Sequence, residues 1–357
     1  MNNTIFISAF NVKSLGSVRI LCDLTHELHK LRLFEKIVVN CNNNINSENF
    51  PKEVVIIRSG IWDSNFLLKI IWQYIGLWVH SYFNHYQYII SLNNLTPNFR
   101  SEFSILYLHN ALPFADYVRP SDGRWLGILF QQFYLKKFLP IGMKRNNLMV
   151  VQQSILKHLV LKRFDFMKDK VKVLPPRQNY INNSGRPSKF LKDYLYLPVN
   201  DYCYKNADSL MIAFCNLGPE YANLDLVVTL DENCNLVKNI KRKKNINLKN
   251  IKFIGPQSWE DNISILENSN ALLWGSSIES WCLPLSEAMM LNVDIIAPRL
   301  PYVEETLKLY ERIYFYPEIN EKSIIEGIAA WRVQKKSTLR HLQTSKITEL
   351  SKIFNLH

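Results

Sequence analysis

The chain has 357 residues, of which 47% are hydrophobic and 21% charged, and its formal net charge is +12. This length predicts two domains, and this balance excludes a disordered chain. So large a positive charge calls for an anionic partner, such as nucleic acid, a nucleotide, or a membrane surface or phosphorylated lipid. Nucleic acid is disfavoured, because the sequence has no zinc-finger spacing, no RNP-like aromatic strand and no heptad-linked basic region.

The cysteines and the apolar segments indicate the compartment. Six cysteines show neither CxxC spacing nor histidine partners at zinc-like intervals, which indicates free thiols in a reducing environment. The amino terminus has no basic segment followed by a long apolar core, so no signal peptide is expected. The longest apolar stretch, residues 66–79, is too short to span a bilayer. We expect a cytoplasmic protein, soluble or peripheral on the inner face of the cytoplasmic membrane.

Strands and helices alternate through the first half of the chain. An apolar run at residues 4–12 precedes a helix that ends near residue 30. Further strands are predicted at residues 36–39, 54–57, 88–91, 105–108 and 148–151. Helices are predicted at residues 65–82 and 125–139, and Trp72, Tyr74 and Trp78 in the first of them are expected to lie in the core. This alternation predicts a parallel α/β sheet.

The pattern breaks near residues 174–186, a polar stretch suited to a linker, and then restarts. Strands are predicted at residues 194–197, 224–230, 251–254, 271–274, 294–297 and 313–316. Helices are predicted between each pair except the second and third, where the basic run at residues 238–249 is interpreted as a solvated loop, with membrane contact as the alternative.

The two halves together predict an α/β protein with two Rossmann-like, parallel-sheet domains facing a cleft. The predicted domains are residues 1–175 and 176–338, and a tail helix at residues 339–357 could return to pack on the first domain. Open parallel sheets bind ligands at the carboxyl ends of their strands, so this arrangement locates a site without identifying its chemistry.

Two glutamates eight positions apart form the most informative pattern. A strand ends at Trp274 and Gly275, a loop carries Glu279, and a helix opens with Pro284 in its first turn, where a missing N–H costs nothing. Glu287 lies in that turn or just beyond it. A helix start offers N–H groups and a partial positive charge to a phosphate, and a carboxylate beside it can hold a ribose diol.

This stretch resembles the E-x7-E signature of retaining GT-B glycosyltransferases of the family 4 type, such as those of bacterial surface-polysaccharide and O-antigen assembly. The F-I-G-P at residues 253–256 and the I-I-A-P at residues 295–298 fit the same family. The resemblance implies that Glu279 lies beside the donor sugar and that Glu287 binds the ribose. It also implies that sugar hydroxyls and phosphates meet the backbone between them, near Trp281, Cys282, Leu283 and Pro284.

Three further site residues are implied by the same resemblance. Lys205, just after the first strand of the donor domain, would reach the diphosphate, although the arginine that usually precedes it is missing; Arg177 or Arg299 could substitute. His109 ends a strand of the first, acceptor-side domain and would line the site near the transferred sugar and the acceptor. Gly16, in a loop with one glycine where two are common, would lie beside the donor phosphates or form a simple turn.

The implied reaction is transfer of a sugar from a UDP- or GDP-linked donor, with retained anomeric configuration, to a glycan or a lipid-linked oligosaccharide. No cofactor and no metal are expected, since the sequence has no DxD triad and the nucleotide sugar is a substrate. The helix at residues 125–139 fits docking on an anionic membrane face. Its aromatic and basic residues are Trp125, Phe130, Phe133, Tyr134, Lys136 and Lys137.

Two alternatives stay open. A GT-B-like protein that binds nucleotide sugars or acts as a scaffold, without catalysis, would fit the irregular glycine loop and the missing arginine. A sugar-nucleotide epimerase would use the same two-domain frame, but the acid/base set that it needs is not found. A phosphate-binding P-loop, a G-x-G-x-x-G fingerprint and a G-x-S-x-G nucleophile elbow are all absent from the sequence.

Overall fold

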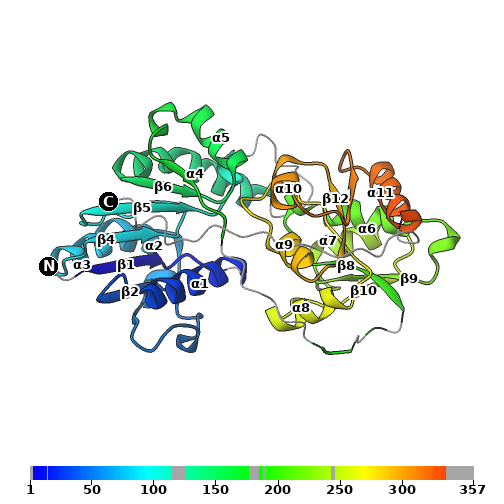
Figure 1. The fold of residues 1–357 in the computed structure, drawn as a ribbon, viewed down its shortest axis with the longest axis horizontal. Coiled ribbons are helices and arrows are strands. Elements are labelled where there is room, and N and C mark those ends of the chain that lie inside the picture. Colours follow the sequence, from blue (N-terminus) through cyan, green and yellow to red (C-terminus); the bar gives the residue numbers. More distant parts are fainter. Residues whose placement is uncertain are drawn as a thin grey trace. The chain divides into compact units, whose positions relative to one another are not determined.

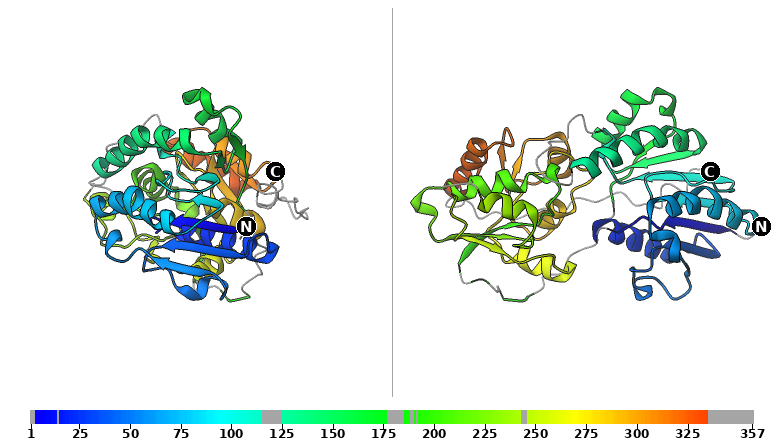
Figure 2. Two further views of the ribbon diagram at one scale, coloured as in Figure 1. Left: turned by 90° about the vertical axis from the view of Figure 1, so that its left-hand side faces the viewer. Right: turned by 180° about the vertical axis from the view of Figure 1, so that it is seen from behind.

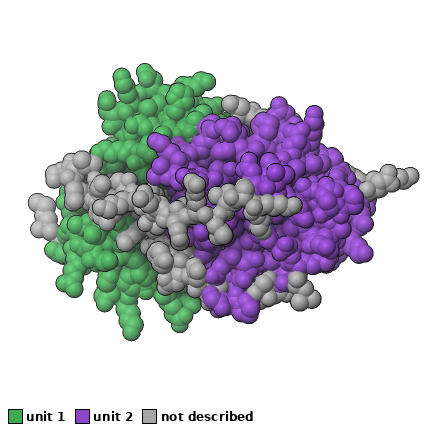
Figure 3. All heavy atoms as spheres, turned by 45° about the vertical axis from the view of Figure 1, so that its right-hand side comes forward, with its two compact units in different colours: residues 1–114, 131–177, 347–357 green, residues 115–130, 178–346 purple. Residues whose placement is uncertain are grey.

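The computed structural model describes residues 3–13, 15–114, 125–176, 185–187, 190, 192–242 and 246–334. They form two compact units, coloured separately in Figure 3. The first unit contains the strands up to residue 173, and the second contains those from residue 193 onward. The predicted tail helix at residues 339–357 and residues 177–184 of the predicted linker lie outside the described residues.

The first unit is built on a sheet of seven strands in the order β3-β2-β1-β4-β5-β6-β7, and every pairing in it is parallel (Figure 1). The strands are β1 (Thr4–Ala9), β2 (Lys36–Cys41), β3 (Val55–Arg58), β4 (Tyr88–Ser91), β5 (Phe103–Leu108), β6 (Leu148–Val151) and β7 (Val171–Val173). Only β7 was not predicted. It has three residues, too few to show an alternating or continuous apolar pattern.

Helices cover both faces of this sheet (Figure 2). The helices are α1 (Leu15–Leu31), α2 (Phe66–Ile71), α3 (Leu77–Phe83), α4 (Trp125–Arg145) and α5 (Ser154–Arg163), of which α4 belongs to this unit only from residue 131 onward. On one face, Leu21, Leu24 and Leu28 of α1 pack in a core with residues of β1 and β2. On the other face, Leu77 of α3 packs against Phe6 of β1. Side chains therefore alternate between two cores along β1, as a doubly covered strand requires.

The helix predicted at residues 65–82 is one helical run with a π-helical turn, η3 (Trp72–Gly76), between α2 and α3. Gly76 is needed in this turn, because a Cβ there would lie 2.4 Å from Cε3 of the Trp72 ring. Trp72 packs partly against the core and donates from Nε1 to Asn40 Oδ1 at 3.1 Å. The prediction that Trp78 lies in the core is wrong, because this side chain is 43% exposed.

The second unit is built on a sheet of six strands in the order β10-β9-β8-β11-β12-β13, again parallel throughout. The strands are β8 (Asp193–Leu197), β9 (Leu224–Val228), β10 (Ile251–Phe253), β11 (Ala271–Leu273), β12 (Asp294–Pro298) and β13 (Ile313–Tyr316). The helices are α6 (Ala207–Cys215), α7 (Asn235–Lys241), α8 (Trp259–Glu267), α9 (Leu283–Met290), α10 (Pro301–Thr306) and α11 (Glu321–Gln334). All six strands agree with the predicted ones.

Helix α7 corrects the prediction of a loop between the second and third strands of this unit. It occupies the beginning of the basic run, and its apolar residues Leu236, Val237 and Ile240 are buried. Lys238 and Lys241 are exposed on the other side. The apolar face consists of only these three residues, and lysines and asparagines surround them in the sequence. The run therefore shows too few apolar residues for a helical period to be recognised.

The strand order places a candidate site in the second unit. Its first strand, β8, lies in the middle of the sheet, with β9 on one side and β11 on the other. The connections that follow β8 and β11 therefore leave in opposite directions, which is the switch point where open α/β sheets bind ligands. No helix among the described residues combines the length and the apolar character needed to cross a bilayer.

Candidate active site

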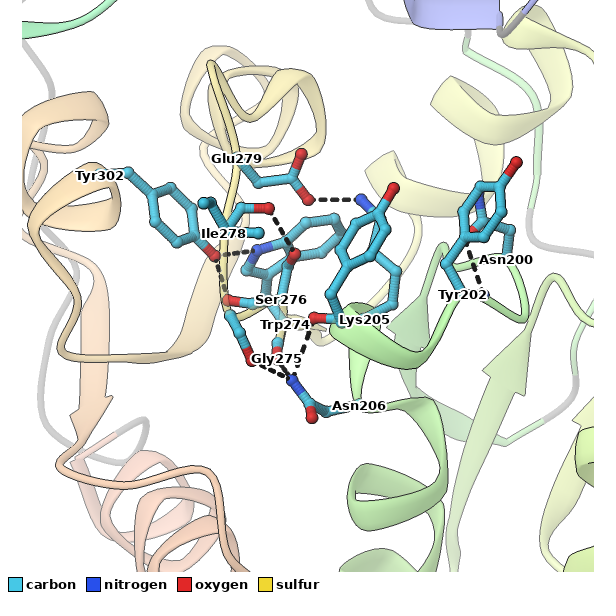
Figure 4. A network of polar contacts seen from close by, with 12 residues as sticks. Asn200, Tyr202, Lys205, Asn206, Trp274, Gly275, Ser276, Ile278, Glu279 and Tyr302 are labelled. Carbon is cyan, nitrogen blue, oxygen red and sulfur yellow. Dashed lines mark hydrogen bonds and ion pairs between the residues drawn. The ribbon is translucent and has the colours of Figure 1, made fainter. Parts of the chain in front are cut away.

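Two loops meet at this switch point and are tied together by hydrogen bonds (Figure 4). One follows β8 and carries Lys205 and Asn206, and the other follows β11 and carries Gly275 to Glu279. The backbone N–H of Ser277 donates to the carbonyl of Tyr204 at 2.8 Å. The Asn206 amide donates to the carbonyl of Gly275 at 2.8 Å and to Oγ of Ser277 at 2.7 Å.

Asn206 can make these contacts because its backbone is left-handed, with φ of +51°. Asparagine tolerates this conformation better than most residues with a side chain. The left-handed residue turns the chain from the short 3-10 helix at Cys203–Lys205 directly into α6. The sequence analysis singled out Lys205 but not Asn206; the signal that could have found it is an asparagine directly before a helix, a residue type that tolerates a left-handed turn.

Lys205 and Glu279, predicted to be separate parts of the site, are ion-paired. Nζ of Lys205 lies 2.5 Å from Oε1 of Glu279, and the side chains are 14% and 16% exposed. The ammonium group also lies 4.8 Å from the centre of the Trp274 ring and 5.6 Å from that of Tyr204. One carboxylate and two aromatic faces thus hold a cation at the edge of the sheet, where an anion can approach it.

A buried hydrogen-bond network, which we call the floor of the site, connects Trp274, Tyr302, Tyr316 and the backbone of Ser276 behind this pair. Nε1 of Trp274 donates to the hydroxyl of Tyr302 at 2.9 Å, and that hydroxyl donates to the carbonyl of Ser276 at 2.6 Å. The hydroxyl of Tyr316 donates to the carbonyl of Trp274 at 2.5 Å. Burial raises the pKa of Tyr302 and of Tyr316 well above the usual value, so both stay protonated donors. The floor therefore fixes the loop that carries Glu279.

Helix α9 begins as predicted. Leu283 is its first residue, Pro284 lies in its first turn, and Glu287 lies just beyond that turn. Leu283 and Pro284 are half-buried, whereas Cys282 is fully buried. Burial, with Glu279 nearby, raises the pKa of the Cys282 thiol well above its usual value, so this thiol is not a nucleophile.

The Trp281 side chain is also engaged away from any ligand. Its Nε1 donates to Oγ of Ser286 at 2.9 Å, and that hydroxyl donates to the carbonyl of Cys282 at 3.2 Å. Trp281 and Cys282 can therefore contribute to a ligand site through their backbone, which is the contribution that sequence analysis predicted for them.

Glu287 has a partner that sequence reasoning missed. Nε1 of Trp259 donates to Oε1 of Glu287 at 3.0 Å. The glutamate is 9% exposed, whereas the indole at the start of α8 is 37% exposed. Glu279 and Glu287 both raise the pKa of the Cys282 thiol that lies between them in the chain, so both carboxylates are close to the start of α9. The only sequence signal for Trp259 was its place in the W-E-D that follows F-I-G-P.

The other two predicted residues, Gly16 and His109, belong to the first unit. Gly16 lies inside the first turn of α1, so the predicted glycine loop or simple turn is a helix start. His109 directly follows β5, its N–H donates to Asn94 Oδ1 at 3.0 Å, and Asn94 Nδ2 lies 3.4 Å from Nε2. Burial lowers the pKa of His109 to about 4, so this imidazole is neutral at pH 7.

The structure does not replace the missing arginine. Arg177 lies outside the described residues. The Arg299 guanidinium pairs with Glu304 at 3.5 Å and lies 4.5 Å above the ring of Phe315. Within the described part of the chain, no three histidine, cysteine, aspartate or glutamate residues gather as metal ligands. Lys205 is thus the cation that the described residues place beside Glu279.

Comparison with known proteins agrees with this geometry. Residues 188–344 match the model of the family described as glycosyl transferases, group 1. The second unit is thus similar to group 1 glycosyl transferases, and residues 188–344 are called the group 1 domain below. The match includes Lys205, Glu279, Glu287 and the switch point between β8 and β11, but not the predicted site residues of the first unit. No match is found among curated proteins.

Solved structures extend the likeness from the group 1 domain to the whole chain. WaaG, a glycosyltransferase involved in lipopolysaccharide biosynthesis, is 13% identical with a TM-score of 0.66, covering 93% of this chain and 91% of that one. HepE from Anabaena, in complex with UDP-glucose, is 12% identical with a TM-score of 0.62, covering 93% and 90%. Sucrose-phosphate synthase from Thermosynechococcus elongatus is 12% identical with a TM-score of 0.65, covering 94% and 90%. At these identities the likeness shows the fold, and it confirms the predicted GT-B class.

Proposed function

We propose that this protein transfers a sugar from a UDP- or GDP-linked donor to a glycan or a lipid-linked oligosaccharide, with retention of the anomeric configuration. The observation that carries the proposal is the meeting of Lys205, Glu279 and the start of α9 at the switch point of a group 1 domain. A sheet edge with a cation, two carboxylates and a helix start suits a nucleoside diphosphate linked to a sugar. HepE, which shares the fold, was solved with UDP-glucose.

In this proposal the group 1 domain acts by electrostatic stabilisation. The bond between the anomeric carbon and the diphosphate breaks, the acceptor oxygen bonds to the same face of the sugar, and the leaving phosphate accepts the acceptor's proton. Lys205 and the N–H groups at the start of α9 stabilise the charge that develops on the leaving diphosphate. Loss of one such contact costs a few kcal/mol, or about a hundredfold in rate. No metal and no cofactor enter this scheme.

The other site residues have separate parts in the proposal. Glu279 lies beside the donor sugar and orients Lys205. Glu287, held by the indole of Trp259, binds the ribose hydroxyls. His109, neutral at pH 7, offers a hydrogen-bonding ring near the acceptor rather than a positive charge. Gly16, at the start of α1, lets the backbone approach the donor phosphates.

For the acceptor we propose a lipid-linked oligosaccharide at the anionic inner face of the cytoplasmic membrane, as in surface-polysaccharide assembly. Helix α4 supports this, because Phe130 and Phe133 are 57% and 64% exposed and Lys137 is exposed beside them. The side chains of Trp125 and Tyr134, predicted to belong to the same face, lie outside the described residues. WaaG, which shares the fold, is involved in lipopolysaccharide biosynthesis.

Thermal stability with nucleotides tests the donor site. UDP or GDP at saturating concentration should raise the melting temperature of the wild type, since a ligand that binds only the folded state stabilises it. The Glu287→Ala variant should lose this increase. Glu326→Ala is the matched control, because Glu326 is an exposed glutamate on α11 of the same unit, and it should keep the increase. Equal increases in all three proteins would remove Glu287 from the site.

Product analysis separates a transferase from a protein that only binds nucleotide sugars. A transferase releases nucleoside diphosphate from the stabilising nucleotide sugar and forms a glycoside whose anomeric configuration, read by NMR, equals that of the donor. A binding protein or scaffold would be stabilised by the same nucleotide sugar without ever releasing the diphosphate. An inverted product would contradict retention while leaving the transferase assignment intact.

A further inference from the structure

A stripe of large apolar side chains lies exposed along one face of the α2–η3–α3 helical run in the first unit. The stripe consists of Leu67, Ile71, Ile75, Trp78 and Tyr82, and these residues are between 40% and 71% exposed. They follow one another at intervals of three or four, so they share one side of the run. The opposite side packs on the sheet through Trp72 and Leu77. This helix therefore has apolar residues on both sides.

The charge around the stripe is positive. Residues 64–101 contain no aspartate or glutamate. The acid just before them, Asp63, pairs with both Lys13 and Lys69, each at 3.2 Å. On a larger scale, residues 1–175 contain 21 lysines and arginines against 11 aspartates and glutamates, a net charge of +10 out of the +12 of the chain. The rest of the chain, with 22 against 20, is nearly balanced.

Residues 96–98 contact both η3, in the middle of the stripe, and the C-terminal end of helix α4. Asn98 is bonded to η3. Its backbone N–H donates to the Gln73 carbonyl at 3.2 Å, and its side-chain amide donates to the Tyr74 carbonyl at 3.3 Å. Two residues earlier, Thr96 accepts a hydrogen bond from Asn146, just after α4, and packs on Gly142 of α4. Among the described side chains of α4 in this unit, the exposed ones are apolar or basic, namely Phe133, Lys137, Ile141, Lys144 and Arg145.

We propose that the stripe and the exposed face of α4 form one docking surface for an anionic lipid bilayer, with the stripe inserted among the lipids and the lysines of α4 at the head groups. Amphipathic helices bind membranes in the interface plane by this combination of apolar area and basic charge. Trp78 and Tyr82 suit insertion to the level of the lipid head groups, because tryptophan and tyrosine side chains favour the boundary between lipid and water. This inference rests on one part of the proposed function, namely that the acceptor is linked to a membrane lipid.

Charge favours a bilayer over a second copy of this chain. Two copies meeting through this surface would bring together two segments 1–175 that each carry a net charge of +10, with no aspartate or glutamate in residues 64–101 to compensate. An anionic bilayer attracts the same charges, at about 1 kcal/mol for each lysine or arginine near its surface. The apolar stripe then adds a part of the binding free energy that salt does not screen.

Vesicle flotation tests the surface with a double variant. The wild type should float with vesicles of phosphatidylcholine and phosphatidylglycerol, and more weakly with phosphatidylcholine alone. Ile75→Ser with Tyr82→Ser should weaken binding by about tenfold or more, because two apolar side chains no longer leave water. Leu309→Ser is the matched control, since Leu309 is 67% exposed in the second unit, and it should bind like the wild type. Unchanged melting temperatures confirm that the variants fold.

Three outcomes would overturn the proposal. One is a double variant that floats as well as the wild type, and another is a wild type that does not float with phosphatidylglycerol at low salt. The third is a wild-type dimer without vesicles that the double variant converts to a monomer, which would make the stripe a subunit interface. Release of diphosphate from the donor in solution, without vesicles, is measured in parallel. If the wild type released no diphosphate, the proposed transferase would be contradicted. If it released diphosphate but did not float with vesicles, only the docking surface would be contradicted.

Discussion

Lys205 and Glu279 form an ion pair in the second unit, and the proposed function predicts opposite effects of this pairing on binding and on transfer. In the proposed site, a nucleoside diphosphate would bring negative charge to Lys205 and compete there with the carboxylate of Glu279. The Glu279→Gln variant should therefore bind UDP or GDP several-fold more tightly while transferring sugar about a hundredfold more slowly. Titration calorimetry and turnover assays measure the two effects. Lys205→Met is the complementary variant, and it should weaken both binding and transfer.

Trp259 acts through Glu287, so we expect it to be a positioning residue. Trp259→Phe keeps an aromatic ring and removes the N–H that donates to Oε1 of Glu287. A hydrogen bond to a charged group is worth about 1.5–3 kcal/mol, so the KM for the donor should rise roughly tenfold with kcat little changed. Steady-state kinetics at varied donor concentration checks this. A fall in kcat at constant KM would place Trp259 in the chemical step instead.

His109 should make the stability of the first unit depend on pH. Its pKa of about 4 is below the value of about 6.5 in the unfolded chain, so the unfolded state binds a proton first as the pH falls. The stability contributed by the neutral ring is complete above pH 6.5 and is lost between pH 6.5 and 4, to a total of about 3 kcal/mol. Urea unfolding of the wild type and of His109→Gln across this range should show a smaller loss in the variant. Parallel curves would show that His109 titrates normally.

At the scale of elements, the left-handed Asn206 joins the 3-10 turn to α6 and ties both site loops together. Asn206→Gly keeps the backbone conformation and removes the side-chain hydrogen bonds to Gly275 and Ser277. Asn206→Ala removes these bonds and adds strain of roughly 1 kcal/mol, because alanine disfavours φ of +51°. Both variants should be less stable than the wild type, and alanine should be the worse of the two in denaturant unfolding. Greater stability of the alanine variant would contradict the role of the turn.

The strands were the elements that the sequence predicted best, because each buried parallel strand is a short continuous apolar run between polar loops. Elements with a weak pattern were missed. Helix α7 buries only Leu236, Val237 and Ile240 within a basic run, and the three-residue β7 is too short for any pattern. The exposed Trp78 was assigned to the core because helical spacing reports which residues share a face of the helix, but not what that face contacts.

The site was predictable where neighbours in sequence are also neighbours in space. Glu279, Pro284 and Glu287 lie in one continuous segment, so their order around the start of α9 followed from the sequence. The ion pair of Lys205 with Glu279 joins residues 74 positions apart, and the indole of Trp259 reaches Glu287 across 28. Such contacts depend on strand order, here β8 beside β11, which a single sequence does not specify.

On the scale of the whole molecule, each unit has its own sheet and its own covering helices, so each can respond to a ligand separately. Hydrogen exchange followed by mass spectrometry should show that UDP or GDP slows exchange most in residues 202–206 and 275–287 of the second unit. The core strands β8, β9 and β12 exchange slowly in any case and should change little. Protection confined to the first unit would mean that the nucleotide binds elsewhere.

The buried thiol of Cys282 makes the start of α9 observable without any substitution. Because the side chain is 1% exposed and its pKa is raised well above the ordinary value, an alkylating reagent can reach a reactive thiolate there only after the segment before α9 opens. The rate of alkylation at this cysteine therefore reports how often the segment before α9 opens. This measurement needs no engineered probe, because the cysteine is already in the chain.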